Sequence, residues 1–244
     1  MMKFKKGILA GLLMAGVLVS YTVNAGVRPQ LTRIVAYATD KETPVEVIND
    51  SSETYMLQSW LEDLQGQDNN IPLVLTPPVM KIEGKKHGKL RLVVMKSEIP
   101  QDRESVYWLS LQEIPPKAKN GADNRLVVAV RSRLKVFVRP DGLNAAGARE
   151  AAKQLTWRVE QEGGKRWLTA TNPSAYYISF GELSISQGGG NKVSVAGKTR
   201  MPPPKGSQRY PLPESMKGGK LTVTWTATHD WGGQGETLKA EVGL

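Results

Sequence analysis

The chain has 244 residues, a formal net charge of +10 and no cysteine. The lack of cysteine excludes disulfide frameworks, thiolate metal sites and cysteine nucleophiles. Two histidines, His87 and His229, are too few for a histidine-rich metal cluster. We therefore expect neither a metal nor a cofactor. The positive charge favours acidic partners in general, but no nucleic-acid-binding motif appears, so we expect no nucleic acid as a partner.

The first residues have the three parts of a secretory signal peptide. Lys3, Lys5 and Lys6 precede an apolar run, 8–19, and small residues follow it up to Ala25. The run is too short to span a membrane. A buried core helix is the alternative, but the basic start and the Val-Asn-Ala end favour a signal peptide cleaved after Ala25. Because no later stretch approaches the roughly 20 apolar residues of a membrane span, we expect no membrane insertion.

Apolar and polar residues alternate in several segments of the first half, with turn signals between them. Alternation with a period of two is the signature of a β-strand with one buried face. The strands expected on this basis are 31–38, 45–48, 55–61, 89–94, 105–114 and 125–138.

A stretch rich in alanine and glycine, 141–153, interrupts this alternation and could hold a short helical turn or a plain linker. We place the domain boundary there, between domains 26–143 and 144–244. Further strands are expected at 155–160, 166–171, 176–186, 192–195 and 221–228. Short strands on both sides of one linker predict an all-β chain of two immunoglobulin-like sandwiches. Without disulfides, the cores would depend on residues such as Trp60, Trp108, Trp157 and Trp225.

The most informative segment is 125–140, RLVVAVRSRLKVFVRP. Neighbouring residues of a strand point to opposite faces, so its apolar and basic side chains separate. The apolar face holds Leu126, Val128, Val130, Leu134, Val136 and Val138, and the basic face holds Arg131, Arg133, Lys135 and Arg139. On pattern alone, this is an inner strand with a solvated basic face.

Several segments in order resemble the periplasmic chaperones of the chaperone-usher pathway for pilus assembly. The most specific are IPQDRESVYWLSLQEIPP, 99–116, and SRLKVFVRP, 132–140; LTRIVAYA, LTPPVMKIEGKKHGKLRLV, TNPSAYYISF and THDWGG are looser. The resemblance implies a boomerang of two immunoglobulin-like domains in the periplasm. Such a protein binds pilus subunits, supplies their missing strand by donor-strand complementation and delivers them to an outer-membrane usher.

The resemblance also implies roles for residues that match its motifs. The donated row falls on Leu126, Val128 and Val130, whose side chains would fill successive pockets of the subunit's groove. Arg33 and Lys135 match the pair that holds the subunit's terminal carboxylate by charge-assisted contacts.

Glu104, Arg139 and Asp230 match charged residues that bridge the two domains and set their angle, although surface ion pairs contribute little as a class. Thr76 and Pro77 match a family turn that can contain a cis peptide bond, and the sequence leaves the isomer open. An exposed apolar edge also makes a self-capping dimer of the free protein reasonable.

The sequence also has features that suggest two other function classes, an enzyme and a glycan-binding module. His229 and Asp230 are adjacent, but neighbours in a strand point to opposite faces, and no nucleophile elbow or phosphate-binding glycine loop accompanies them. We therefore expect no enzyme. The alternative is a secreted sandwich module that binds a glycan or surface polymer, with Trp167 and Trp231 as its candidate aromatic platform.

Overall fold

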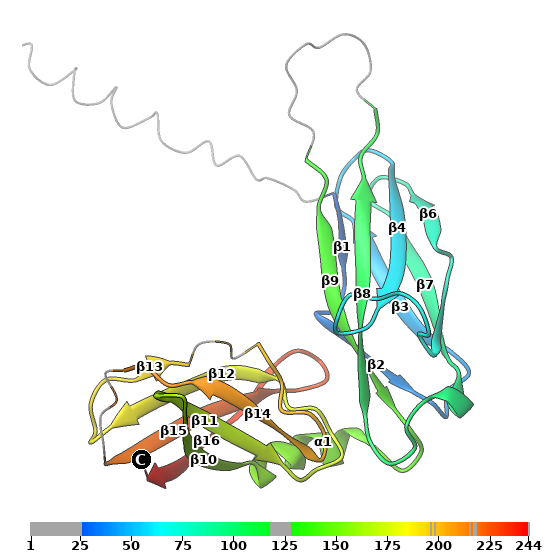
Figure 1. Ribbon diagram of the computed structural model, residues 1–244. Helices are drawn as coiled ribbons and strands as arrows, with labels where there is room; N and C mark the ends of the chain where they lie inside the picture. Colours follow the sequence, from blue (N-terminus) through cyan, green and yellow to red (C-terminus); the bar gives the residue numbers. More distant parts are fainter. Residues whose placement is uncertain are drawn as a thin grey trace, which may run out of the picture.

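The computed structural model describes residues 26–117, 128–195, 197, 199–214, 216 and 219–243. The predicted signal peptide and Leu126 lie outside these residues. Within them, two β-sandwiches follow one another along the chain and meet near their ends (Figure 1). The expected all-β boomerang of two immunoglobulin-like domains is confirmed. None of the helices in the described ranges has the length and apolar character to span a membrane.

The first sandwich packs a four-stranded sheet against a five-stranded one. The four-stranded sheet has the order β1 (Val27–Pro29), β3 (Thr43–Asn49), β7 (His87–Val94), β5 (Leu73–Thr76). The five-stranded sheet has the order β2 (Arg33–Tyr37), β9 (Arg131–Arg139), β8 (Ser105–Ile114), β4 (Tyr55–Glu62), β6 (Val79–Ile82). A short 3-10 helix, η1 (Lys96–Glu98), precedes β8. Alternate apolar residues of these strands form the core, including Val45, Val47, Leu57, Leu90, Leu92, Leu109 and Val136.

The first strand of the chain is split between the two sheets. β1 pairs with β3, whereas β2 pairs in parallel with β9, from Arg33 opposite Lys135 to Tyr37 opposite Arg139. β8 covers the other side of β9 from Arg131 to Val138. In the described part of the chain, β9 therefore has an unpaired edge from Arg131 to Leu134, on the side where β2 begins.

The second sandwich packs a three-stranded sheet against a four-stranded one. Their orders are β10 (Thr156–Glu162), β11 (Lys165–Asn172), β14 (Gly206–Pro211), and β13 (Val193–Ser194), β12 (Phe180–Gln187), β15 (Lys220–Thr228), β16 (Gln234–Gly243). Its core includes Leu168, Ile178, Leu183, Ile185, Tyr210, Val223 and Trp225.

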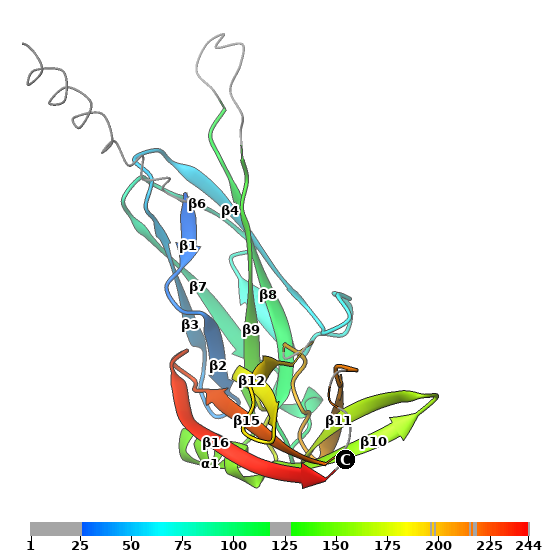
Figure 2. The same cartoon turned by 90° about the vertical axis from the view of Figure 1, so that its left-hand side faces the viewer.

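The 141–153 stretch contains the helix α1 (Ala145–Ala151), which continues into the 3-10 helix η2 (Ala152–Gln154). The side chain of Asn144 accepts a hydrogen bond from the Gly147 N–H at 2.9 Å and so caps the first turn. Ala151 and Ala152 are buried in the second sandwich. Figure 2, turned by 90°, shows α1 near the lower end of the first sandwich, where the two sandwiches meet. The boundary after residue 143 stays a prediction.

Two expectations about the cores and strands were wrong. Trp60 and Trp108 do not belong to the core of the first sandwich, because the alternation of β4 and β8 turns Leu57 and Leu109 inward and both tryptophans outward. Trp225 is buried and Trp157 packs against the second core.

The strand expected from residue 125 begins at Arg131 instead, and residues 128–130 are not part of it. The register ends with Gln112 opposite Arg131. Its continuation would place Pro115 opposite Val128, and proline has no N–H to continue the ladder. The Thr76–Pro77 peptide bond, which the sequence left open, is cis.

Candidate functional site

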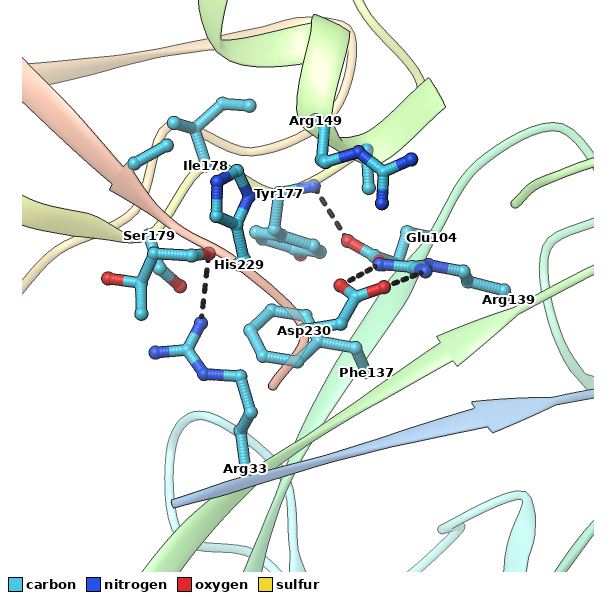
Figure 3. A pocket seen from close by; sticks show the side chains of 13 residues that line it. Arg33, Glu104, Phe137, Arg139, Arg149, Tyr177, Ile178, Ser179, His229 and Asp230 are labelled. Atoms are coloured by element: carbon cyan, nitrogen blue, oxygen red, sulfur yellow. Dashed lines mark hydrogen bonds and ion pairs between the residues drawn. The ribbon is translucent and has the colours of Figure 1, made fainter. Parts of the chain in front are cut away.

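The two sandwiches enclose a small polar cleft where they meet (Figure 3). Strands β2 and β9, the start of β8, helix α1 and two segments of the second sandwich, 177–179 and 227–230, contribute its lining. The enclosed volume is about 30 Å³, enough for a small polar group or a water molecule but not for a metabolite.

Arg139, at the end of β9, links both domains across this cleft. Its Nε donates to Glu104 Oε1 at 2.8 Å, and its Nη1 and Nη2 donate to the two carboxylate oxygens of Asp230 at 2.7 Å each. Glu104 in turn accepts the N–H of Tyr177 at 2.8 Å through Oε2. The structure thus brings the three residues that match the bridging motif into one network, drawn in Figure 3.

This network is buried, unlike the surface pairs considered from the sequence. The side chains of Arg139 and Glu104 are 3% and 1% exposed. The guanidinium also lies between the rings of Tyr37 and Tyr176, 5.6 and 5.5 Å from their centroids. The expectation of a wholly solvated basic face on β9 is therefore wrong at Arg139, because the second sandwich covers the end of the strand.

Burial and neighbouring charges have opposite effects on the pKa values of Glu104 and Arg139. Burial raises the pKa of Glu104 to about 7, although Arg139 and the Tyr177 N–H act to lower it. Burial acts to lower the pKa of Arg139, but its hydrogen bonds to Asp230 and the charge of Glu104 outweigh burial and raise it. Arg139 therefore stays charged at every physiological pH.

Arg33 and Lys135 are direct neighbours on β2 and β9. Arg33 Nη1 donates to the Thr228 carbonyl of the second sandwich at 3.3 Å, while its buried Nε has no hydrogen-bond partner in the described structure. The Lys135 ammonium lies 5.8 Å from the centroid of the Trp108 ring. Within the described ranges, neither cation forms an ion pair with a carboxylate.

Both cations are partly removed from water. Burial, followed by the nearby charge of Arg33, lowers the pKa of Lys135 to about 8. Burial also lowers the pKa of Arg33, against the opposing charges of Asp230 and Glu104. Two adjacent, half-buried cations repel each other, so an anion placed between them would relieve both costs.

The predicted donor row begins where β9 leaves the sheet. Val130 and Val128 are 39% and 60% exposed, so two neighbouring positions of the row present apolar side chains to solvent. Val130 is still held, because its carbonyl accepts the Glu113 N–H at 3.1 Å and its own N–H donates to Glu113 Oε1 at 3.2 Å. Leu126, the third member of the row, lies outside the described residues.

Sequence analysis overlooked a cluster on the outer face of the five-stranded sheet. Glu62 Oε2 accepts hydrogen bonds from Arg131 at 2.9 Å, from Arg133 at 3.2 Å and from the Ser110 hydroxyl at 2.8 Å. Arg131 and Arg133 lie over the rings of Trp60 and Trp108, 4.6 and 4.8 Å from their centroids. The alternation of β4 and β8 could have placed both tryptophans outward, but nothing in the sequence connects Glu62 with residues about 70 positions later.

His229 and Asp230 lie in the loop after β15 rather than in a strand. His229 stacks on Trp231, with ring centroids 5.9 Å apart, whereas the Asp230 carboxylate faces Arg139. The two side chains serve different neighbours, so the loop does not form a catalytic dyad.

Both halves of the chain match known proteins. Residues 26–144 match the N-terminal domain of PapD, described as a pili and flagellar-assembly chaperone, and residues 150–238 match the C-terminal domain of the pili assembly chaperone PapD. The chaperone protein LpfB of Salmonella typhimurium is 34% identical over 220 residues, which cover 89% of each chain.

Two solved structures have the same fold. The YadV chaperone superposes with a TM-score of 0.74 at 28% identity and covers 89% of this chain and 100% of its own. The SafB chaperone, solved with the SafA pilin of Salmonella enterica, gives a TM-score of 0.74 at 23% identity and covers 90% and 97%. The chain thus belongs to the PapD-like family of pilus assembly chaperones.

Proposed function

We propose that this protein is a periplasmic chaperone that binds pilus subunits by lending them a β-strand and delivers them to an outer-membrane usher. One observation carries the proposal. The unpaired edge of β9 runs from an exposed apolar row, Val128 and Val130, to two half-buried cations, Arg33 and Lys135. Among the residues that the structure describes, neither cation has a carboxylate partner.

The geometry suggests how a subunit would bind. Its C-terminal carboxylate would lie between Arg33 and Lys135, and its last strand would follow the open edge of β9 toward Val130 and Val128. Because the carboxylate marks the end of the guest strand, this strand would run parallel to β9, as β2 does along the other half of the same edge. The backbone bonds would supply pairing and the carboxylate would fix the register.

The apolar row would supply much of the binding free energy. Each valine or leucine that becomes fully buried contributes roughly 1.5 to 3 kcal/mol before the cost of ordering the segment. The same exposed edge could pair with a second copy, so we also propose that the free protein can form a self-capping dimer. Sedimentation at high concentration tests this, and a purely monomeric protein would contradict it.

Neither of the other function classes gains support from the site. We propose that the protein is not an enzyme, since His229 and Asp230 face different partners. The candidate glycan platform is divided, because Trp167 lies on β11 with the Arg209 guanidinium 5.2 Å from its centroid, while Trp231 lies in the loop before β16.

The test is co-expression of the full precursor with candidate pilus subunits, followed by isolation of the complex from the periplasm. Wild type should retain a subunit in a one-to-one complex, whereas Lys135→Ala and Arg33→Ala should leave it to be degraded. Lys89→Ala, on an exposed position of β7, is the matched control and should behave as wild type. If all variants retain the subunit equally, the anchor is wrong; if wild type retains carbohydrate and no polypeptide, the glycan module is right.

A further inference from the structure

The first sandwich buries a carboxylate that the subunit site does not use. Glu113, near the end of β8, is 3% exposed. Its Oε2 accepts the Val27 N–H at 2.6 Å, and its Oε1 accepts the Val130 N–H at 3.2 Å. No cation of the described ranges forms an ion pair with it. A buried carboxylate held only by uncharged donors is costly, and a charge-assisted partner would stabilise it.

Gly26 lies directly against this carboxylate. It is buried, and its carbonyl accepts the Asp50 N–H at 2.8 Å. A Cβ added at Gly26 would lie 2.8 Å from Glu113 Oε2 and 2.5 Å from the Tyr55 ring. The space beside the Gly26 Cα is thus filled by Glu113 and Tyr55. The backbone nitrogen of Gly26 is one bond, about 1.46 Å, from that Cα and therefore lies close to the Glu113 carboxylate.

We propose that Glu113 is the binding site for the free α-ammonium group that signal-peptide cleavage creates at Gly26. This inference rests on the proposed export, with cleavage after Ala25. Cleavage converts the Gly26 nitrogen from an uncharged amide into an ammonium with an ordinary pKa of about 7.7 to 8.0. The new cation forms beside Glu113, which in the described ranges is a buried carboxylate without a cation, so the ion pair satisfies both groups.

The ion pair links the start of the chain to the start of the donor row. Glu113 holds Val130 with its side chain and with its backbone N–H. Val130 is the point at which β9 leaves the sheet, next to exposed Val128. Fixing the Glu113 carboxylate therefore fixes the end from which the donor row extends. Removal of the leader would fasten this end only after export.

The first measurement is made on the mature protein purified from the periplasm. Its N-terminal sequence should begin at Gly26, and the α-ammonium pKa, from the pH dependence of acylation by acetic anhydride, should lie at least one unit above its ordinary range. An ordinary pKa in the folded wild type overturns the proposal without any variant. A different first residue overturns the predicted cleavage point together with the ion pair.

A cycle of variants separates charge from packing. One extra N-terminal alanine moves the ammonium away, and Glu113→Gln removes its partner. The extension should lower the Tm of wild type by several degrees and change that of Glu113→Gln much less, because both changes remove the same interaction. Glu53→Gln, at an exposed position two residues before Tyr55, is the matched control, and the extension should lower its Tm as much as that of wild type. If the extension lowers the Tm of wild type, Glu113→Gln and Glu53→Gln by the same amount, the proposal is overturned.

Subunit capture is measured in parallel on the extended protein. If capture persists while the α-ammonium pKa is ordinary and the extension lowers the Tm equally with and without Glu113, the proposed function stands and the ion pair is wrong. If wild type captures no subunit but shows the coupling, the ion pair stands and the proposed function is wrong.

Discussion

Two arginines of the same cleft differ in whether their charge is matched. Arg139 makes three hydrogen bonds to two carboxylates and is almost fully buried. Arg33, on the neighbouring strand, donates to one carbonyl and leaves its buried Nε without a partner in the described structure. The first arrangement is complete and joins the domains. The second, with Lys135 beside it, has no carboxylate in the described structure, which is what the proposed anion site requires.

Removing the Arg139 side chain should give the largest change in stability. Arg139→Ala leaves Glu104 buried without its cation, so the free energy of unfolding should fall by about 3 to 5 kcal/mol. Urea unfolding measures this loss. Arg131→Ala, on the exposed part of the same strand, is the matched control and should cost less than about 1 kcal/mol. Equal losses for the two variants would show that the buried network contributes nothing special.

Removing the charge of Lys135 should weaken the binding of a subunit and leave folding intact. Lys135→Met keeps the packing of the side chain but removes its charge. The affinity for a purified subunit should fall by about 2 kcal/mol, or about thirtyfold in Kd, since a partly buried charged contact is lost. The urea midpoint of the free protein should not fall, because a repulsive pair is removed. A subunit with an amidated C-terminus should bind wild type and Lys135→Met equally.

The lowered pKa of Lys135 predicts that subunit binding depends on pH. A carboxylate binds the protonated lysine, so binding raises the pKa of Lys135 above its free value of about 8. The contribution of Lys135 to the affinity should therefore be complete below pH 8, and the affinity should fall as the pH rises above 8, by up to about tenfold per unit. Isothermal titration at several pH values tests this dependence. Lys135→Met should show no such fall, and a fall that persists in this variant would assign the effect to another group.

The smallest effect is expected on the outer face. Glu62→Gln removes the charge that holds Arg131 and Arg133 over the tryptophans. It should lower the free energy of unfolding by about 0.5 to 1.5 kcal/mol and shift the fluorescence of Trp60 and Trp108. Glu46→Gln, whose partner Lys89 is 3.9 Å away and exposed, should change neither quantity. An unchanged Glu62→Gln protein would mean that the arginines keep their positions without the carboxylate.

Sequence reasoning succeeded where a pattern is local. Alternation placed β8 and most of β9, because a strand with one buried face repeats every two residues. It missed β1, β5 and β6, which are only three or four residues long. It also missed β14 and β16, edge strands with few buried side chains. Short strands and exposed edges carry too few buried residues to produce a period.

The site was predictable only in part. The resemblance pointed to Arg33, Lys135 and the three residues of the network, and the structure brings each group together. Alternation alone treated Arg139 as solvated, because the second sandwich that covers it lies beyond the strand. The role of Glu113 could not be predicted from the sequence, because its partners Val27 and Val130 are 86 and 17 residues away along the chain.

The parallel pairing of β2 with β9 stops at Lys135, and this limit has a consequence for which clients the protein accepts. A guest strand can occupy only the remaining length of the edge, with its last residue held at one end and its groove facing Val130 and Val128. Because side chains alternate, one additional residue at the guest's C-terminus would turn every contact to the wrong face. In the proposed arrangement, subunits would be selected by the distance between their chain end and their groove rather than by the identity of their final residues.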